Sequence, residues 1–400
     1  MEFSVRSSYN TGRKEGIAML AKMYLTNFLS FCQRTEFDFT ASKYEILADS
    51  NLSKDGKHTK GAMFIGPNAA GKSNALKGIS LLIDLIKGEG ARLTNYAYRF
   101  ADISATKLEY EFCVSGKAVF YEINDDHHTN TLQESLRIEN TEVLSRSGSH
   151  GELHIGTLSV AEDNLDKNTL FLRTASFNTG RFPQEPILRE LMTFLLNSYS
   201  IDGYNQLART GENVLKFAEE NGVETLNEYL KALNYDFYLE YGKFSQSMVE
   251  GIHYAVGSPQ KRIFFKRNNF PVPVLFRQET QGNQVFADLL PQLIQVIEQP
   301  GMLVIDEFGN SLHNRLAERI IRFFMENAVN SQFFFTSHDT NLISNSVLRP
   351  DQIHVISFEG KDGSTVQRIS KFGPREAQNL EKMYLGGMFE GLPMYDDVSD

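Results

Sequence analysis

The residues from Gly66 to Ser73 (GPNAAGKS) have types and a spacing that suit them to hold phosphate groups. Glycine tolerates positive φ and lets backbone N–H groups approach phosphate oxygens closely. Lys72 can reach the outer phosphates of a nucleotide, and the hydroxyl of Ser73 can hold Mg²⁺. The residues expected to bind the phosphates of ATP are Gly66, Asn68, Ala69, Ala70, Gly71, Lys72, Ser73 and Asn74.

The segments that flank this loop agree with such a role. Residues 62–65 are apolar and predict a buried strand, whereas residues 74–77 favour a helix. A strand, a glycine loop and a helix in succession distinguish a phosphate loop from a chance match in a turn. The N-terminus of the helix would add the positive end of its dipole. We therefore predict a nucleotide site here.

A pair of acids supplies a second part of the chemistry. Asp306 and Glu307 directly follow the apolar residues 302–305, which predict another buried strand. We expect Asp306 to hold Mg²⁺, and Glu307 to orient the attacking water or take its proton. A buried strand that meets a solvated turn would look the same locally, but the phosphate loop upstream favours the catalytic interpretation.

Two further elements lie before and after the acids. Thr280 and Gly282 open an apolar helix, and a hydroxyl, a glycine and a helix N-terminus together can clamp a γ-phosphate. His338 follows a run of three phenylalanines and could contact the same phosphate. A histidine after a strand is usually structural, but its place behind the other elements favours a switch role.

The spacing of these elements indicates the class of ATPase. Lys72 and Asp306 lie 234 residues apart, which is typical of nucleotide folds split around inserted domains. The phosphate loop, the segment of Thr280 and Gly282, the acid pair and His338 follow one another in the order typical of the ABC/SMC-like ATPases, which the chain resembles. In those ATPases the second element is called the signature. We expect an α/β fold of this P-loop type with a mixed sheet and a largely helical insertion. No heptad stretch is present, so no long coiled coil is expected.

The chain divides into four expected parts. Residues 1–18 are polar and predict a loose, disordered extension. We expect residues 19–180 and 274–400 to form the two parts of the ATPase domain, and residues 181–273 to form a mainly helical insertion or lid. Within the first ATPase part we expect opening strands in residues 23–40 and a hairpin that turns at Ser115 and Gly116, followed by a third strand. Residues 141–165 are rich in Ser, Gly and Asp and predict a surface loop.

Composition limits the function classes. The chain has 400 residues, 41% hydrophobic, and only two cysteines, which indicates a globular protein of a reducing compartment. It has no apolar run long enough for a bilayer and no signal peptide, so we expect a cytoplasmic protein without membrane contact. The net charge of −10 argues mildly against a sequence-reading DNA protein. A basic run at residues 258–269 could track a nucleic-acid backbone or form a solvated hairpin with its phenylalanines turned inward.

A closer resemblance covers nearly the whole chain from Met19. The strings MYLTNFLSF, GPNAAGKSNALKGI, ETQGNQ, IDEFGNSLH, FTSHDTNLI and LRPDQIHVI occur in that order, before a terminal cluster of Tyr384, Leu385, Gly386 and Pro393. The chain resembles the SMC-like ATPases of bacterial abortive-infection and anti-phage systems. That group includes AbiL-type and RloA-like ATPases, the PARIS ATPase subunit and, more distantly, the Septu ATPase.

The resemblance implies roles for individual residues. Asp306 and Glu307 match the metal-binding and water-activating acids, and His338 matches the switch. Thr280 and Gly282 match a signature that completes the site of an opposing subunit. Three positions depart from the group, with Thr280 in place of Ser, Gly309 in place of Asp and Asn314 in place of Pro. The last two would weaken communication between paired sites. The sequence does not locate the glutamine loop of these ATPases.

The resemblance also implies a function. We expect an ATP-hydrolysing sensor or scaffold subunit that forms a homodimer or higher homo-oligomer. It would control a separately encoded effector such as a nuclease or toxin, because no nuclease motif remains in this chain. A phage protein or nucleic acid would be the trigger. The alternative is a DNA-maintenance ATPase of the SMC or recombination-mediator type, and a transporter ATPase is a third, weaker possibility.

Overall fold

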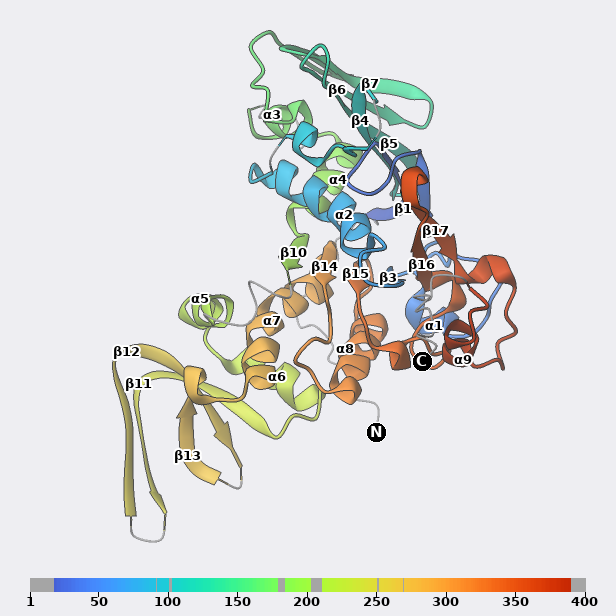
Figure 1. Cartoon of the computed structure of the whole chain (residues 1–400). Helices are drawn as coiled ribbons and strands as arrows, with labels where there is room; N and C mark the ends of the chain where they lie inside the picture. The colour runs from blue at the N-terminus through green and yellow to red at the C-terminus, as the bar shows by residue number, and fades with distance from the viewer. Residues whose placement is uncertain are drawn as a thin grey trace.

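A computed structural model describes residues 18–90, 92–100, 103–178, 184–202, 211–249, 252–268 and 270–389. Its described strands form three sheets, and its helices lie on both faces of the middle one (Figure 1). The extension expected at residues 1–18 falls outside the described residues, except for Ala18, the first residue of strand β1. No described helix is both long and apolar enough to cross a membrane.

The middle sheet is mixed, as expected. Its strand order is β10-β14-β15-β3-β16-β17, and every pairing is parallel except β16 with β17. The strands are β10 (Tyr199–Asp202), β14 (Met302–Asp306), β15 (Gln332–Thr336), β3 (Gly61–Ile65), β16 (Ile353–Phe358) and β17 (Ser364–Arg368). Since parallel strands end at the same edge, the segments after β3, β14 and β15 must meet there.

Side chains along the strands of the middle sheet point alternately to its two faces, and each face belongs to a different hydrophobic core. Phe64, Val304 and Phe334 face helix α2 (Lys72–Lys87), whereas their neighbours in sequence face helices α7 (Gln281–Glu298) and α8 (Asn314–Asn327). Successive side chains in a strand point to opposite faces, so a strand covered on both sides is apolar throughout. This is why these strands appear in the sequence as continuous apolar runs.

The second sheet is antiparallel, in the order β2-β1-β4-β5-β6-β7-β8-β9. Its first strands are β1 (Ala18–Thr26), β2 (Thr35–Asp38), β4 (Ala105–Val114), β5 (Lys117–Asp126) and β6 (Thr131–Ile138). Ser115 and Gly116 have φ of 50° and 80°, which suits the two-residue turn of a right-twisted hairpin. The predicted hairpin and third strand are confirmed.

The surface loop predicted at residues 141–165 is wrong. The segment forms three strands, β7 (Thr141–Ser147), β8 (His150–Ile155) and β9 (Leu158–Glu162), which extend the antiparallel sheet. Gly148 and Gly156, both with positive φ, are confined to the tight turns between them. Leu144, Leu153 and Leu158 are buried, one on each strand, and are the apolar residues that indicate these strands in the sequence. The turn residues dominate the composition of the whole segment, so its short strands are not apparent from composition alone.

The segment expected to be mainly helical is mixed. It contains the helices α4 (Pro186–Leu196), α5 (Glu212–Asn221) and α6 (Glu224–Ala232), in the regions where helices are predicted. From Phe237 on it forms an antiparallel sheet of β11 (Phe237–Val249), β12 (Ile252–Arg267) and β13 (Phe270–Leu275). The hairpin of β11 and β12 projects away from the middle sheet (Figure 1).

The basic run at residues 258–269 lies on this hairpin and follows the second of its two interpretations. Phe264 and Phe265 are buried, at 1% and 0% exposed. Lys266 is paired with Glu240, and Arg267 with Glu279. The two cations nearest the core are thus already neutralised, which argues against a basic groove at this end of the run.

The remaining helices are short. They are α1 (Ala48–Asn51), α3 (Phe171–Asn178) and α9 (Leu380–Leu385). None of the described helices exceeds the 18 residues of α7, so the expectation of no long coiled coil is confirmed for this part of the chain. Tyr384 is buried on α9, Gly386 is its C-cap, and Pro393 lies outside the described residues.

Candidate active site

The phosphate loop connects the end of β3 to the start of α2, at the edge where the parallel strands end. Gly66 and Gly71 have φ of 147° and 108°. A Cβ at Gly66 would lie 2.1 Å from the carbonyl oxygen of Ile356, and one at Gly71 would lie 2.4 Å from Oγ of Ser364. Real Cβ atoms do not approach other atoms so closely. Both glycines are therefore required by packing as well as by their backbone conformation.

The sides of the loop are fixed by neighbouring serines. Ser364 Oγ donates to the carbonyl of Ala70 at 2.6 Å, and Asn74 Nδ2 donates to Ser30 Oγ at 2.8 Å. Asn68 and Ala69 form the exposed tip, where Ala69 has a φ of 62°. The tip is thus open to a ligand while its two ends are held.

Lys72 lies inside the loop. Its Nζ donates to the carbonyl oxygens of Gly66 and Pro67, both at 2.9 Å, and the residue is 7% exposed. Burial lowers the pKa of Lys72, and the carboxylates of Asp306 and Glu307 oppose that shift. The loop therefore holds a cationic donor close to the two acids predicted from the sequence.

Asp306 and Ser73 meet across the sheet edge. Ser73, in the first turn of α2, donates from Oγ to Oδ1 of Asp306 at 3.1 Å. Asp306 is the last residue of β14, which is separated from β3 by β15. A hydroxyl and a carboxylate are hard oxygen ligands of the kind Mg²⁺ prefers. The donor set therefore fits a magnesium ion that accompanies a nucleotide on the phosphate loop.

Glu307 leaves the strand in a different direction from Asp306. Its φ is 55°, in the left-handed region that few residues other than glycine adopt. Its carboxylate accepts a hydrogen bond from Nδ2 of Asn310 at 3.2 Å. Because the backbone turns here, two consecutive acids occupy separate positions at one edge, as separate roles in metal and water binding would require.

Thr336 was missed by the sequence reasoning, although it connects both acids. It ends β15 and is 1% exposed. Its Oγ1 donates to Oδ1 of Asp306 at 2.5 Å and accepts from the backbone N–H of Glu307 at 2.7 Å. The available signal was a polar residue directly after three phenylalanines, at the end of a predicted buried strand. Thr336 orients the acids and is a positioning residue.

We expect Thr336→Val to slow ATP hydrolysis about 10- to 100-fold, the usual effect of losing a group that orients a metal ligand. Valine keeps the shape but leaves Oδ1 of Asp306 and N–H of Glu307 without this partner. The concentration of Mg²⁺ that gives half-maximal hydrolysis should rise. Thr336→Ser is the matched control and should retain both the rate and the Mg²⁺ dependence. A slower rate with an unshifted Mg²⁺ midpoint would indicate a purely structural role.

His338 lies two residues beyond β15, at the same edge, and is exposed. Thr280 is the N-cap of α7 and is also exposed. A Cβ at Gly282 would lie 2.6 Å from the carbonyl oxygen of Ser311, so this glycine permits α7 to approach the loop after the acids. Among the hydrogen bonds of the described residues, none joins Thr280 or Gly282 to the phosphate loop of the same chain.

Two departures from the resembled group have local backbone explanations. Gly309 has a φ of 91°, so the backbone after the acids is in a conformation that glycine adopts without strain. Asn314 is the first residue of α8, the helical position at which proline is most common. A proline there would stiffen the helix start, and asparagine does not change the helix boundary.

The comparisons with known proteins agree with this architecture. Residues 62–344, more than two thirds of the chain, match the family described as "AAA domain, putative AbiEii toxin, Type IV TA system". No curated protein matches the sequence. An SMC head bound to the C-winged helix domain of ScpA aligns with a TM-score of 0.52 at 12% identity, over 87% of this chain and 96% of that one.

A second solved structure has the same fold. It is an SMC head domain with an extended coiled coil, bound to the C-terminal domain of ScpA and derived from Pyrococcus furiosus. It aligns with a TM-score of 0.50 at 12% identity, over 89% of this chain and 98% of that one. At such identities the likeness concerns the fold, which is that of an SMC head.

Proposed function

The chain belongs to this AAA domain family, and from its membership and its site we propose that it binds and hydrolyses ATP with Mg²⁺. The observation that carries the proposal is the meeting of Lys72, Ser73 and Asp306 at one sheet edge. Asp306 lies more than 230 residues after the adjacent Lys72 and Ser73, and the groups of all three are the ones that phosphate and magnesium require.

Each residue has a defined task in this proposal. The N–H groups of the loop and the start of α2 bind phosphate oxygens, and Lys72 exchanges its two carbonyl partners for a charge-assisted bond to phosphate. Ser73 and Asp306 hold Mg²⁺, which neutralises charge on the phosphates. Glu307 orients the attacking water and accepts its proton, while Thr336 keeps both acids in position.

We further propose that Thr280 and Gly282 serve the site of a second copy of the chain. The N-terminus of α7 is exposed, and the Thr280 side chain makes no capping bond to its own helix, so this helix start suits a γ-phosphate presented from outside. Each closed dimer would then contain two sites, each with a phosphate loop from one chain and a signature from the other. His338 is proposed to contact the same phosphate from its own chain.

Thr280→Arg tests the shared site. We expect nucleotide binding to survive, because the chain's own phosphate loop is untouched, while hydrolysis falls about 100-fold, as on removal of one preorganised donor. Binding of a non-hydrolysable ATP analogue and phosphate release are the two measurements. Thr280→Ser, which keeps the hydroxyl, should behave like the wild type.

Mixing two inactive variants sharpens this test. One chain carries Thr280→Arg and the other carries both Lys72→Ala and Glu307→Gln. In the mixed dimer, one site takes its loop and acids from the first chain and its signature from the second, so all parts of that site are intact. Some activity should return on mixing, provided that one working site suffices, and the wild-type rate per chain should fall on dilution. A rate per chain that stays constant far into a demonstrated monomer range would overturn the shared site.

We propose that ATP-driven closure holds or releases a separate effector, such as a nuclease or toxin, in an anti-phage system. The support is the sequence resemblance and the family to which the chain belongs, whose description names a toxin. The solved SMC heads also carry bound segments of another protein, ScpA. A test is co-purification of the product of a neighbouring nuclease, toxin or reverse-transcriptase gene with wild-type, Glu307→Gln and Lys72→Ala chains. Equal capture by all three would contradict ATP-controlled release.

The alternative, a DNA-maintenance ATPase, makes a different prediction. It requires hydrolysis to rise severalfold with DNA and to lose that response as salt increases. On the hairpin, Lys266 and Arg267 are paired with acids, which weighs against this alternative. Stimulation by DNA with no effect of a neighbouring gene product would favour it over the effector proposal.

A further inference from the structure

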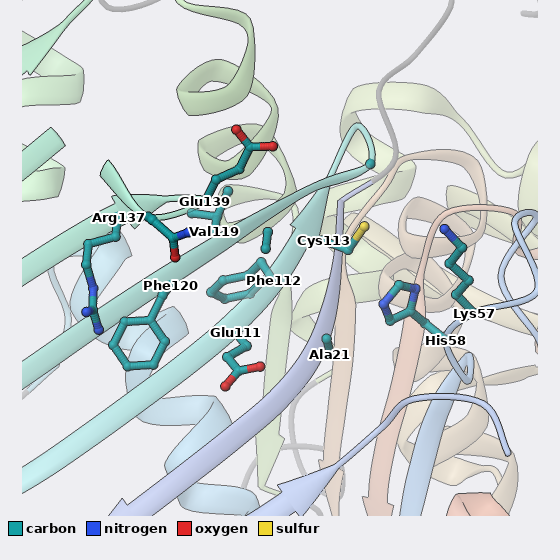
Figure 2. A pocket seen from close by; sticks show the side chains of 13 residues that line it. Ala21, Lys57, His58, Glu111, Phe112, Cys113, Val119, Phe120, Arg137 and Glu139 are labelled. Carbon is teal, nitrogen blue, oxygen red and sulfur yellow. The ribbon is translucent and has the colours of Figure 1, made fainter. Parts of the chain in front are cut away.

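A hollow of about 470 Å³ lies beside strands β4 and β5 of the antiparallel sheet, and Cys113, Phe120, Lys57 and His58 are among the residues that line it. Figure 2 shows its lining side chains from β4, β5 and β6, such as Phe112, Phe120 and Arg137, together with Lys57 and His58 from the segment before β3. At one end of the hollow the sulfur of Cys113 lies near the imidazole of His58. Neither residue has a task in the proposed ATPase mechanism.

Three different ligand types converge at this end. The sulfur of Cys113, a ring nitrogen of His58 and a carboxylate oxygen of Asp55 all lie within 4.8 Å of one another. Nδ1 of His58 is 3.7 Å from Oδ1 of Asp55. No other group of this kind occurs among the described residues. The cluster joins a loop that precedes β3 to a strand 55 residues further along the chain.

His58 provides an independent observation. The residue is 6% exposed, and its Nδ1 has no hydrogen-bond partner within the described part of the chain. A buried polar atom without a partner is destabilising, so such an atom in a native protein usually has a partner such as water or an ion. Here Nδ1 is 3.7 Å from the Asp55 carboxylate, beyond hydrogen-bond distance, in a ring that also lies next to the Cys113 thiol.

The local backbone holds the three residues in place. In the turn at residues 53–58, the N–H of Ser53 donates to the carbonyl of His58, and the N–H of His58 donates to Oγ of Ser53. Asp55 accepts from Oγ of Ser53 at 2.6 Å and from the N–H of Lys57 at 3.1 Å. Cys113 is fixed by its strand, where it pairs with Met19 and Ala118. The cluster therefore consists of a tight turn facing a rigid strand.

We propose that Cys113, His58 and Asp55 form a binding site for a transition-metal ion, with Zn²⁺ the best match. Zinc takes sulfur, imidazole nitrogen and carboxylate oxygen in a tetrahedral arrangement, whereas Mg²⁺ prefers oxygen alone. Zinc–ligand bonds of about 2.0–2.3 Å place the ligand atoms about 3.5 Å apart. The cluster therefore needs only a small contraction, which the turn can supply because Asp55 lies at the surface.

Metal binding at this cluster would release protons. Burial lowers the pKa of His58, and the neighbouring Asp55 carboxylate opposes that shift. Burial and the Asp55 carboxylate raise the pKa of the Cys113 thiol, so metal binding must release its proton to solvent. Three protein ligands leave a fourth position of a tetrahedral site for water or a small anionic ligand. The metal would fasten the turn before β3 to the β4–β5 hairpin.

The test is a titration of the full chain with Co²⁺ after removal of metals by a chelator. We expect one Co²⁺ per chain with a sulfur-to-cobalt charge-transfer band, visible bands of tetrahedral cobalt, and loss of both on addition of Zn²⁺. Cys113→Ser should abolish the charge-transfer band and weaken binding more than about 100-fold, since even changes around ligands cost 10- to 100-fold. Cys32→Ser is the matched control, because it removes the other thiol, and should keep the band.

Two further measurements test whether the charge-transfer band comes from the magnesium site or changes because a variant is unfolded. Asp306→Asn should leave the charge-transfer band unchanged, because it alters only the proposed magnesium site. Circular dichroism must show that each variant is folded. Absence of the band in the folded wild type, or its loss in Cys32→Ser but not in Cys113→Ser, would overturn the proposal. Either result would leave the proposed ATPase function untouched.

Discussion

Glu307→Gln should bind ATP normally and hydrolyse it at least about 100-fold more slowly than the wild type, because it lacks the only proposed general base. Glutamine has nearly the same shape and can still accept the hydrogen bond from Asn310. The left-handed backbone at this position is also kept. Single-turnover phosphate release measures the rate, and binding of ATP is measured separately.

The same variant should accumulate as an ATP-bound oligomer, since closure persists when hydrolysis fails. Size-exclusion chromatography with ATP and Mg²⁺ should show the larger species, and omission of ATP should remove it. Thr336→Ser, which keeps the orientation of both acids, serves as a control that stays active. Turnover by Glu307→Gln at the wild-type rate would exclude Glu307 from the mechanism.

Lys72→Ala should instead lose affinity for the nucleotide itself. A hydrogen bond to a charged group contributes about 1.5–3 kcal/mol, which corresponds to roughly 10- to 150-fold in binding. The loss should stay within this range, because the wild-type side chain gives up its bonds to the carbonyls of Gly66 and Pro67 when it turns to the phosphate, and that cost offsets part of the gain. Equilibrium binding of a non-hydrolysable ATP analogue measures the effect.

Lys77→Ala on the same helix is the matched control for Lys72→Ala. Lys77 lies five residues further along α2 and pairs with Asp84 at 3.1 Å, so its loss removes a positive charge of the same kind. Nucleotide affinity should then change by less than about threefold, as expected for a surface ion pair. Equal affinity of Lys72→Ala and the wild type would mean that the loop is not the nucleotide site.

Much of the candidate site could be predicted because its signals are local. A phosphate loop needs a strand, two glycines and a helix in succession, and each has a short-range signature around Gly66 and Gly71. Asp306 was recognisable because its carboxylate directly follows an apolar strand, and a residue at the end of such a strand lies where a ligand can bind. The parallel strands were likewise predictable, since strands covered on both faces are apolar throughout.

Other features have no local signature. Thr336 is one polar residue after three phenylalanines, and its role arises from the pairing of β14 with β15, which places its hydroxyl against Asp306 and Glu307. Residues 141–165 were misread because turn glycines outweighed the short strands between them. The hairpin at the basic run was one of two interpretations, but the full sheet of β11 to β13 falls in a segment expected to be mainly helical, because the helical pattern upstream was extended too far.

The strand, loop and helix that hold Lys72, and the strand that ends in Asp306, follow from the sequence because backbone conformation and burial depend there on neighbouring residues. The folded chain adds contacts between distant segments: Ser73 lies 3.1 Å from Asp306, Thr336 bonds to both acids, and Cys113 lies near His58. These contacts depend on which strands become neighbours. That choice is made by packing across the whole chain, where the same apolar runs would fit several strand orders.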